Sequence, residues 1–188
     1  MKNIPKLFFL ILCCSSLLAE INPAPLNQST KLQELLGKKN CLIIQNSKKI
    51  GRIDAISGLA RARIEKIDVQ DLSGRNESVN GIKVTVILTE AEKTKEAYAF
   101  LDSEELPGVM DSLKTMKDLI KQTTKKEYAK ASYNTQGNFR VGFYNEGNNV
   151  KIFLSCEIPS STVVEFQAKR IDEFINIITD SINELKKS

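Results

Sequence analysis

Residues 82–89 read IKVTVILT, and this alternation decides the fold class. The aliphatic side chains share one parity, which predicts a strand that buries one of its faces: Ile82, Val84, Val86 and Leu88. A similar segment begins 68 residues later, where residues 150–156 read VKIFLSC. Two strands of this kind, each preceding a helical pattern, predict antiparallel sheets covered by helices, which is an α+β fold.

The segments around these two strands predict further strands over 41–45, 61–69 and 97–101 in the first half, and over 128–133, 138–144 and 162–168 in the second. In the 61–69 segment, Ile64 and Ile67 differ in parity, which predicts a bulge or a bend. Polar residues predict a turn over 46–49 and a hairpin over 145–149.

Two amphipathic helices follow the strand groups. The first is predicted from the apolar stripe Leu106, Val109, Met110, Leu113, Met116 and Ile120, and the second from Ile171, Phe174, Ile175, Ile178, Ile182 and Leu185. The similarity of DSLKTM (111–116) to DSINEL (180–185) favours a duplicated unit of three to four strands and one helix, with pseudo-repeats over about 40–122 and 127–187. Binary patterning alone produces similar segments, and this alternative stays open.

The chain begins with the features of an export signal. Lys2 and Lys6 precede the apolar run LFFLIL (7–12), and Ala19 offers a small residue for cleavage. The run is too short to span a bilayer permanently. We therefore expect a signal peptide over 1–19, an exposed leader and short helix over 20–37, one domain over 38–188, and a periplasmic or secreted location. Cys13 and Cys14 keep lipid attachment open, and only that alternative places the protein on a membrane.

Removal of the signal leaves Cys41 and Cys156, which in an oxidising compartment predict one disulfide, with two free thiols as the alternative. The formal charge of +4 falls to about +2, because Lys2 and Lys6 are lost. This near-neutral balance gives no case for polyanion binding, so we expect no nucleic-acid partner.

The residue types exclude several chemistries. The chain contains no histidine, which removes the Ser-His and Cys-His nucleophile pairs and the commonest zinc ligand. No phosphate-binding glycine motif occurs. We expect no cofactor and no metal ion.

Three acidic residues are the candidates for chemistry: Asp102, Glu104 and Glu105. Paired carboxylates perform acid–base catalysis, but acids at the start of a helix also cap it and interact with its dipole, and capping is the favoured interpretation. The basic segment 121–130 and the neighbouring pair Arg61 and Arg63 suggest anion contacts, or only solvated surfaces.

Two segments carry a resemblance to known proteins. AYAFLDSEEL (97–106) and YNTQGNFRVGFY (133–144) together resemble a family of small, uncharacterised secreted bacterial proteins with an FLDxEEL-type motif, over roughly residues 40–186. The resemblance implies no activity. The predicted order of elements, in which a group of strands is followed by a helix and the unit then recurs, is also similar to the Whirly-type fold that binds single-stranded DNA.

These observations favour an exported, non-enzymatic binding or structural domain of the bacterial cell envelope, whose partner is an unidentified protein or envelope component. A Whirly-like single-stranded nucleic-acid-binding protein is the first alternative. A secreted hydrolase that uses the Asp102–Glu105 carboxylates is the second.

Overall fold

The computed structural model describes residues 29–55, 58–74, 77–91, 93–122, 128–147 and 149–187. The predicted signal peptide, with Cys13 and Cys14, and residues 20–28 of the predicted leader lie outside these residues. The elements are, in chain order, α1 (Lys31–Leu36), β1 (Ile43–Asp54), β2 (Ala60–Asp71), β3 (Ser78–Glu90), β4 (Lys93–Asp102), the 3₁₀ turn η1 (Ser103–Glu105), α2 (Leu106–Gln122), β5 (Lys130–Asn134), β6 (Arg140–Glu146), β7 (Asn149–Cys156), β8 (Thr162–Gln167), the 3₁₀ turn η2 (Ala168–Arg170) and α3 (Ile171–Leu185).

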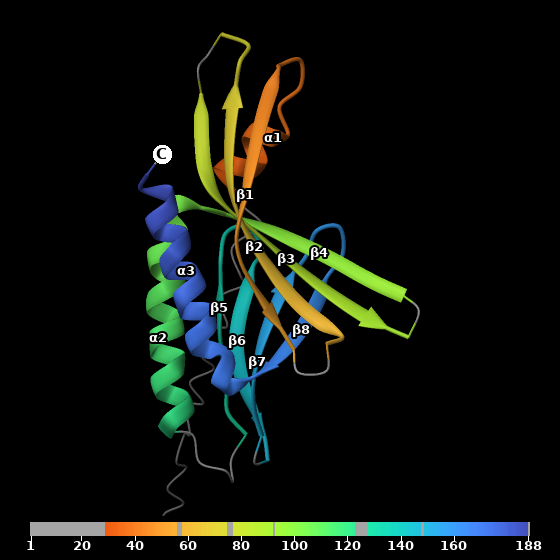
Figure 1. The fold of residues 1–188 in the computed structure, drawn as a ribbon, viewed down its shortest axis with the longest axis vertical. Coiled ribbons are helices and arrows are strands. Elements are labelled where there is room, and N and C mark those ends of the chain that lie inside the picture. Colours follow the sequence, from red (N-terminus) through yellow and green to blue (C-terminus); the bar gives the residue numbers. More distant parts are fainter. Residues whose placement is uncertain are drawn as a thin grey trace, which may run out of the picture.

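The described strands form two antiparallel sheets, which confirms the predicted α+β class. Sheet 1 has the order β1-β2-β3-β4 and sheet 2 the order β5-β6-β7-β8. Each sheet is followed by a 3₁₀ turn and a long helix, and α2 and α3 lie side by side along one flank of the molecule (Figure 1). The order of elements therefore recurs as the sequence comparison suggests, while descent of the two halves from a duplication stays a prediction.

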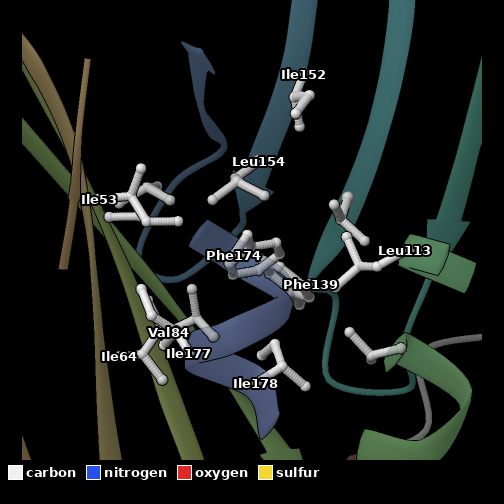
Figure 2. Packing of buried hydrophobic residues seen from close by; sticks show 14 of the residues in the cluster. Ile53, Ile64, Val84, Leu113, Phe139, Ile152, Leu154, Phe174, Ile177 and Ile178 are labelled. Atoms are coloured by element: carbon white, nitrogen blue, oxygen red, sulfur yellow. The ribbon is translucent and has the colours of Figure 1, made fainter. Parts of the chain in front are cut away.

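One hydrophobic core joins the two sheets and the two long helices. Ile53, Ile64 and Val84 enter it from sheet 1, and Ile152 and Leu154 enter from sheet 2. Leu113 comes from α2, and Phe174 of α3 lies against Phe139 in an edge-to-face pair with ring centroids 6.3 Å apart (Figure 2). Both halves of the chain therefore depend on the same core.

A second, smaller cluster covers the opposite face of sheet 1 at one end. Leu32 and Leu35 of α1 are buried there against Ile67, Val69 and Phe100. Ile64 points into the main core and Ile67 points toward α1. The two isoleucines differ in parity because each face of β2 is covered at a different end of the strand. The bulge predicted within 61–69 is wrong, because β2 pairs with β3 in continuous register and the extra residue lies in β1, between Lys49 and Gly51.

Both predicted amphipathic helices are present, and α2 carries Pro107 in its first turn. In α3 the buried stripe is rotated from the predicted one. Ile177 and Ser181 are buried, whereas Ile175 and Ile182 are only partly buried. The reason is a close approach between α3 and β1, because a Cβ at Gly51 would overlap the Ile177 side chain. None of the described helices combines the length and apolar composition needed to cross a membrane.

The predicted turn at Asn46-Ser47-Lys48-Lys49 is wrong. These residues lie inside β1, which runs from Ile43 to Asp54 and pairs with β2 in continuous register up to Lys49. Their polar character reflects exposure, because β1 is an edge strand and residues 44–49 are all exposed. A polar segment of an exposed edge strand has the same composition as a turn. Composition alone therefore does not distinguish the two.

The predicted disulfide is absent, because Cys41 and Cys156 are both free thiols. Cys156 lies in the main core, where its thiol contacts the Val84 carbonyl at 3.6 Å. Val84 pairs with Ile64, whereas Cys41 lies beyond the Ile43–Asp71 pair at the other end of β2. Seven residues of strand separate the two positions by roughly 20 Å, far beyond the Cα separation that a disulfide allows.

Candidate functional site

Asp102, the first of the predicted site residues, caps a helix. Its carboxylate is buried and accepts hydrogen bonds from the backbone N–H groups of Lys31 at 2.7 Å and Leu32 at 3.1 Å. These are the first N–H groups of α1, which have no acceptor within the helix. Asp102 therefore ties the end of β4 to α1, and the exposed Glu104 pairs with the Lys31 ammonium beside it.

Glu105 joins the same junction to the turn between β5 and β6. One carboxylate oxygen accepts from the Asp102 N–H at 2.9 Å, as the predicted capping box requires, and the other accepts from the Gln136 N–H at 2.7 Å. Burial raises the pKa of Glu105, and the two backbone hydrogen bonds oppose that rise. Next to Gln136, Gly137 packs so closely on the Phe100 carbonyl that a Cβ would overlap it.

The two segments that carry the family resemblance therefore meet in space. The FLDSEEL segment supplies Asp102 and Glu105, and the YNTQGNF segment supplies Gln136 and Gly137. The geometry gives all three motif carboxylates structural partners, which favours the capping interpretation. Among the described residues, no group of three or more His, Cys, Asp or Glu side chains is arranged to hold a metal ion.

The predicted basic candidates do not gather at one place. Lys121 pairs with Asp118 at 2.9 Å near the end of α2, and Lys130 lies over the Phe153 ring on sheet 2, while residues 123–127 are outside the described part of the chain. Arg63 pairs with Glu65 at 3.2 Å and approaches Glu96 at 3.8 Å. Arg61 lies on the same exposed side of sheet 1. This surface mixes both charges, as the solvated face of a sheet does.

The most unusual surface belongs to the end of sheet 1 that extends beyond the long helices (Figure 1). On the side opposite α1, the register aligns side chains of three strands in rows. We call this surface the open face, and it consists of Leu42, Ile44, Asn46, Lys48, Lys66, Asp68, Gln70, Leu72, Ser78 and Asn80. It continues the same sheet face that, lower down, forms the main core.

Three aliphatic side chains form the apolar part of the open face. Leu42, Ile44 and Leu72 have 66%, 42% and 47% of their surface exposed. The Leu72 N–H donates to the Leu42 carbonyl at 2.8 Å, so these two residues are direct neighbours across the strands, and Ile44 follows Leu42 on the same side. Single exposed leucines are ordinary, whereas these three aliphatic side chains together form an apolar patch at the edge of the sheet.

A groove of about 340 Å³ borders the open face where the helices end. Asn80 of β3, Leu106 and Pro107 of α2, and Ile182 and Leu185 of α3 line it together with Ser103 and Lys186. Beside it, Glu184 pairs with Lys48 at 2.5 Å and with Lys187 at 2.6 Å. These two lysines lower the pKa of the Glu184 carboxyl to about 2, with Lys187 the stronger cause. Three lysines, Lys48, Lys186 and Lys187, lie at this border with Glu184, so the border of the open face is basic.

The sequence reasoning did not identify the open face. Its signal was the segment CLII (41–44), in which adjacent residues are all apolar although only one side of the strand is buried. The outward residues of such a run either meet a second layer or remain exposed. In β1, Ile43 packs toward α1, and Leu42 and Ile44 point the other way.

Comparisons with known proteins identify no family. No family model and no curated protein sequence matches the chain. A solved structure of SsgB, from work on longitudinal cell division during sporulation of Streptomyces coelicolor, aligns over 76% of this chain and 90% of that chain. The TM-score is 0.28 and the sequence identity is 12%, a level at which neither a common fold nor a common function follows. The function must therefore be argued from the surfaces of the molecule itself.

Proposed function

We propose that the chain is an exported, non-enzymatic domain of the bacterial cell envelope that binds a protein partner on the open face. The observation that carries the proposal is the exposure of Leu42, Ile44 and Leu72 on a sheet face that is elsewhere buried. Full burial of an exposed aliphatic side chain contributes about 1.5–3 kcal/mol, and these three side chains are 42–66% exposed, so their burial supplies part of the affinity of a complex.

The export part of the proposal rests on residues 1–19, and the native N-terminus tests it. We expect mass spectrometry of the protein from the producing cells to show a chain that begins near Glu20. A lipid-modified Cys13 or Cys14 would replace simple secretion with membrane anchoring. An intact Met1 on cytoplasmic protein would contradict export altogether.

Site-specific photo-crosslinking tests the binding part. A photoreactive amino acid in place of Ile44 should give a discrete crosslinked product in the producing cells, and Leu42→Gln with Leu72→Gln should abolish it. The same amino acid in place of Leu59, which is 54% exposed at the far end of sheet 1, is the matched control. Equal products from both positions, or none that depends on Leu42 and Leu72, would contradict the proposal.

The two alternatives carry no specific structural observation in their favour. The hydrolase alternative needs free carboxylates, and Asp102 and Glu105 are held by backbone N–H groups. The nucleic-acid alternative rests on the order of elements alone. Both stay predictions, which turnover on envelope substrates and a shift of oligo(dT) at low salt would test.

A further inference from the structure

Among the described strands, none pairs with the outer edge of β1 beside the open face, and the backbone groups along this edge follow a regular pattern. Leu42 and Leu72 form a hydrogen-bonded pair, and the register of β1 with β2 is continuous from Ile43 to Lys49. Hydrogen bonding alternates along an antiparallel pair, so the N–H and C=O groups of Ile43, Gln45 and Ser47 point away from β2. In the described part of the chain, no strand pairs with β1 on that side.

The other edge of sheet 1 differs from this one. Tyr98 of β4 exchanges two hydrogen bonds with Ile158, at 2.7 and 3.2 Å, so a segment of the chain itself bridges that edge. Native proteins usually shorten, cover or charge an exposed edge. The β1 edge has only Lys48 and Lys49 at one end, and apolar residues at the other.

We propose that this edge accepts one extended segment of a partner protein as an additional antiparallel strand, with aliphatic residues opposite Leu42 and Ile44 and acidic residues opposite Lys48 and Lys49. The inference rests on the proposed binding function of the open face and specifies the class of partner. Main-chain hydrogen bonds to Ile43, Gln45 and Ser47 supply affinity, and the alternating side chains supply specificity.

Charge fixes the composition of one end of the incoming strand. Lys48 and Lys187 both pair with the carboxylate of Glu184 where β1 meets the end of α3, at 2.5 and 2.6 Å, and Lys49 follows Lys48 in β1. A strand that passes this point with carboxylates gains complementary contacts, whereas a basic strand is repelled. In an antiparallel strand these acidic residues lie at the N-terminal end, because that end faces Lys49.

A second copy of the chain fits this edge poorly. In an antiparallel β1–β1 pair centred on Asn46, Lys48 of each copy would lie opposite Ile44 of the other. The ammonium groups would lack acidic partners, and the aliphatic residues would face charged ones. The edge is therefore complementary to a different chain.

The test uses a blocked peptide with the sequence EETTTVTL, whose residues run opposite positions 49 to 42. Titration into the purified, isotope-labelled protein should shift the backbone amide signals of residues 42–49 and slow the hydrogen exchange of the Ile43, Gln45 and Ser47 amides. The sequence KKTTTVTL should bind about tenfold more weakly, which is a difference of about 1.4 kcal/mol. A peptide methylated on the amides that face β1 should not bind.

Two variants of the protein separate a loss of peptide binding from a loss of folding. Gln45→Pro removes an outward N–H that β2 does not use, and an edge strand tolerates proline at such a position. Gln45→Ala keeps the N–H and is the matched control. We expect Gln45→Pro to unfold at nearly the same temperature as Gln45→Ala and to lose peptide binding.

The outcomes separate this inference from the proposed function. If Gln45→Pro and the methylated peptide both bind normally, strand addition is wrong, although crosslinking at Ile44 still supports docking on the open face. If the free protein forms a dimer that Gln45→Pro dissolves, the occupant is a second copy and the inference is overturned. Absence of any peptide binding overturns it as well.

Discussion

Asp102 accepts hydrogen bonds from the first N–H groups of α1, although 70 residues separate it from Leu32 in the sequence. In Asp102→Ala the Lys31 and Leu32 N–H groups lose their acceptor within a buried junction. We expect a loss of about 1–3 kcal/mol in the free energy of unfolding, measured by chemical denaturation. Glu104→Gln, at an exposed neighbouring position, should change it by less than about 0.5 kcal/mol. Equal stabilities of the two variants would contradict the capping role.

Cys156 differs from Cys41 in its surroundings, and its thiol should respond to pH in a characteristic way. Burial raises the pKa of Cys156 to about 12 from an ordinary value of 9.0. The folded protein therefore keeps a proton that the unfolded chain loses, so this contribution to stability is complete below about pH 9 and declines as the pH rises toward 12.

Denaturation at increasing alkaline pH tests this expectation when the wild type is compared with Cys156→Ala. The wild type should lose more stability than the variant over that range, by about 1.4 kcal/mol per pH unit at most. In the native protein at neutral pH, an alkylating reagent should modify Cys41 and leave Cys156 unmodified. Rapid alkylation of Cys156 would show that the core is not closed around it.

At the scale of elements, β1 and α3 approach each other closely because Gly51 of β1 has no side chain. A Cβ at Gly51 would lie within 3.0 Å of several atoms of Ile177, a buried, β-branched residue that cannot easily move. We expect Gly51→Ala to reduce the free energy of unfolding by about 1–3 kcal/mol. In a double-mutant cycle with Ile177→Ala, the combined loss should be smaller than the sum by about 1 kcal/mol. Additive losses would show that the two residues do not compete for space.

The same two elements show how far the sequence could predict the structure. Strand β8 and the stripe of α2 follow from simple periodicity, because each has one buried face. β1 was predicted too short, because its exposed residues have no apolar partner to mark them as strand. Ile177 and Ser181 were missed because a glycine on another strand decides which side of α3 is buried. The capping role of Asp102 and a short helix before Gly37 were both predicted, but no local pattern shows that Asp102 accepts from the N–H groups of this helix, α1.

At the scale of the whole molecule, the two halves share one core. Each half contributes one sheet and one long helix, and residues from both lie in the same buried cluster. Side chains of both halves meet around Phe174 of α3, with Ile53 and Val84 of sheet 1 on one side and Leu113 of α2 on the other (Figure 2). The second half, residues 128–187, has about 60 residues, a size at which an isolated domain is only marginally stable even with its core complete. The whole chain should therefore unfold in one cooperative step.

Splitting the chain between Gln122 and Tyr128 tests whether the two halves unfold as one cooperative unit. We expect neither fragment alone to unfold cooperatively, because the inner face of each sheet would lose its cover. Mixed fragments should associate and recover the circular dichroism spectrum of the intact protein. In the intact chain, tyrosine fluorescence and circular dichroism should give coincident denaturation curves. A fragment that folds by itself, or two separate transitions, would show that the halves are independent domains and that the shared core contributes little to their stability.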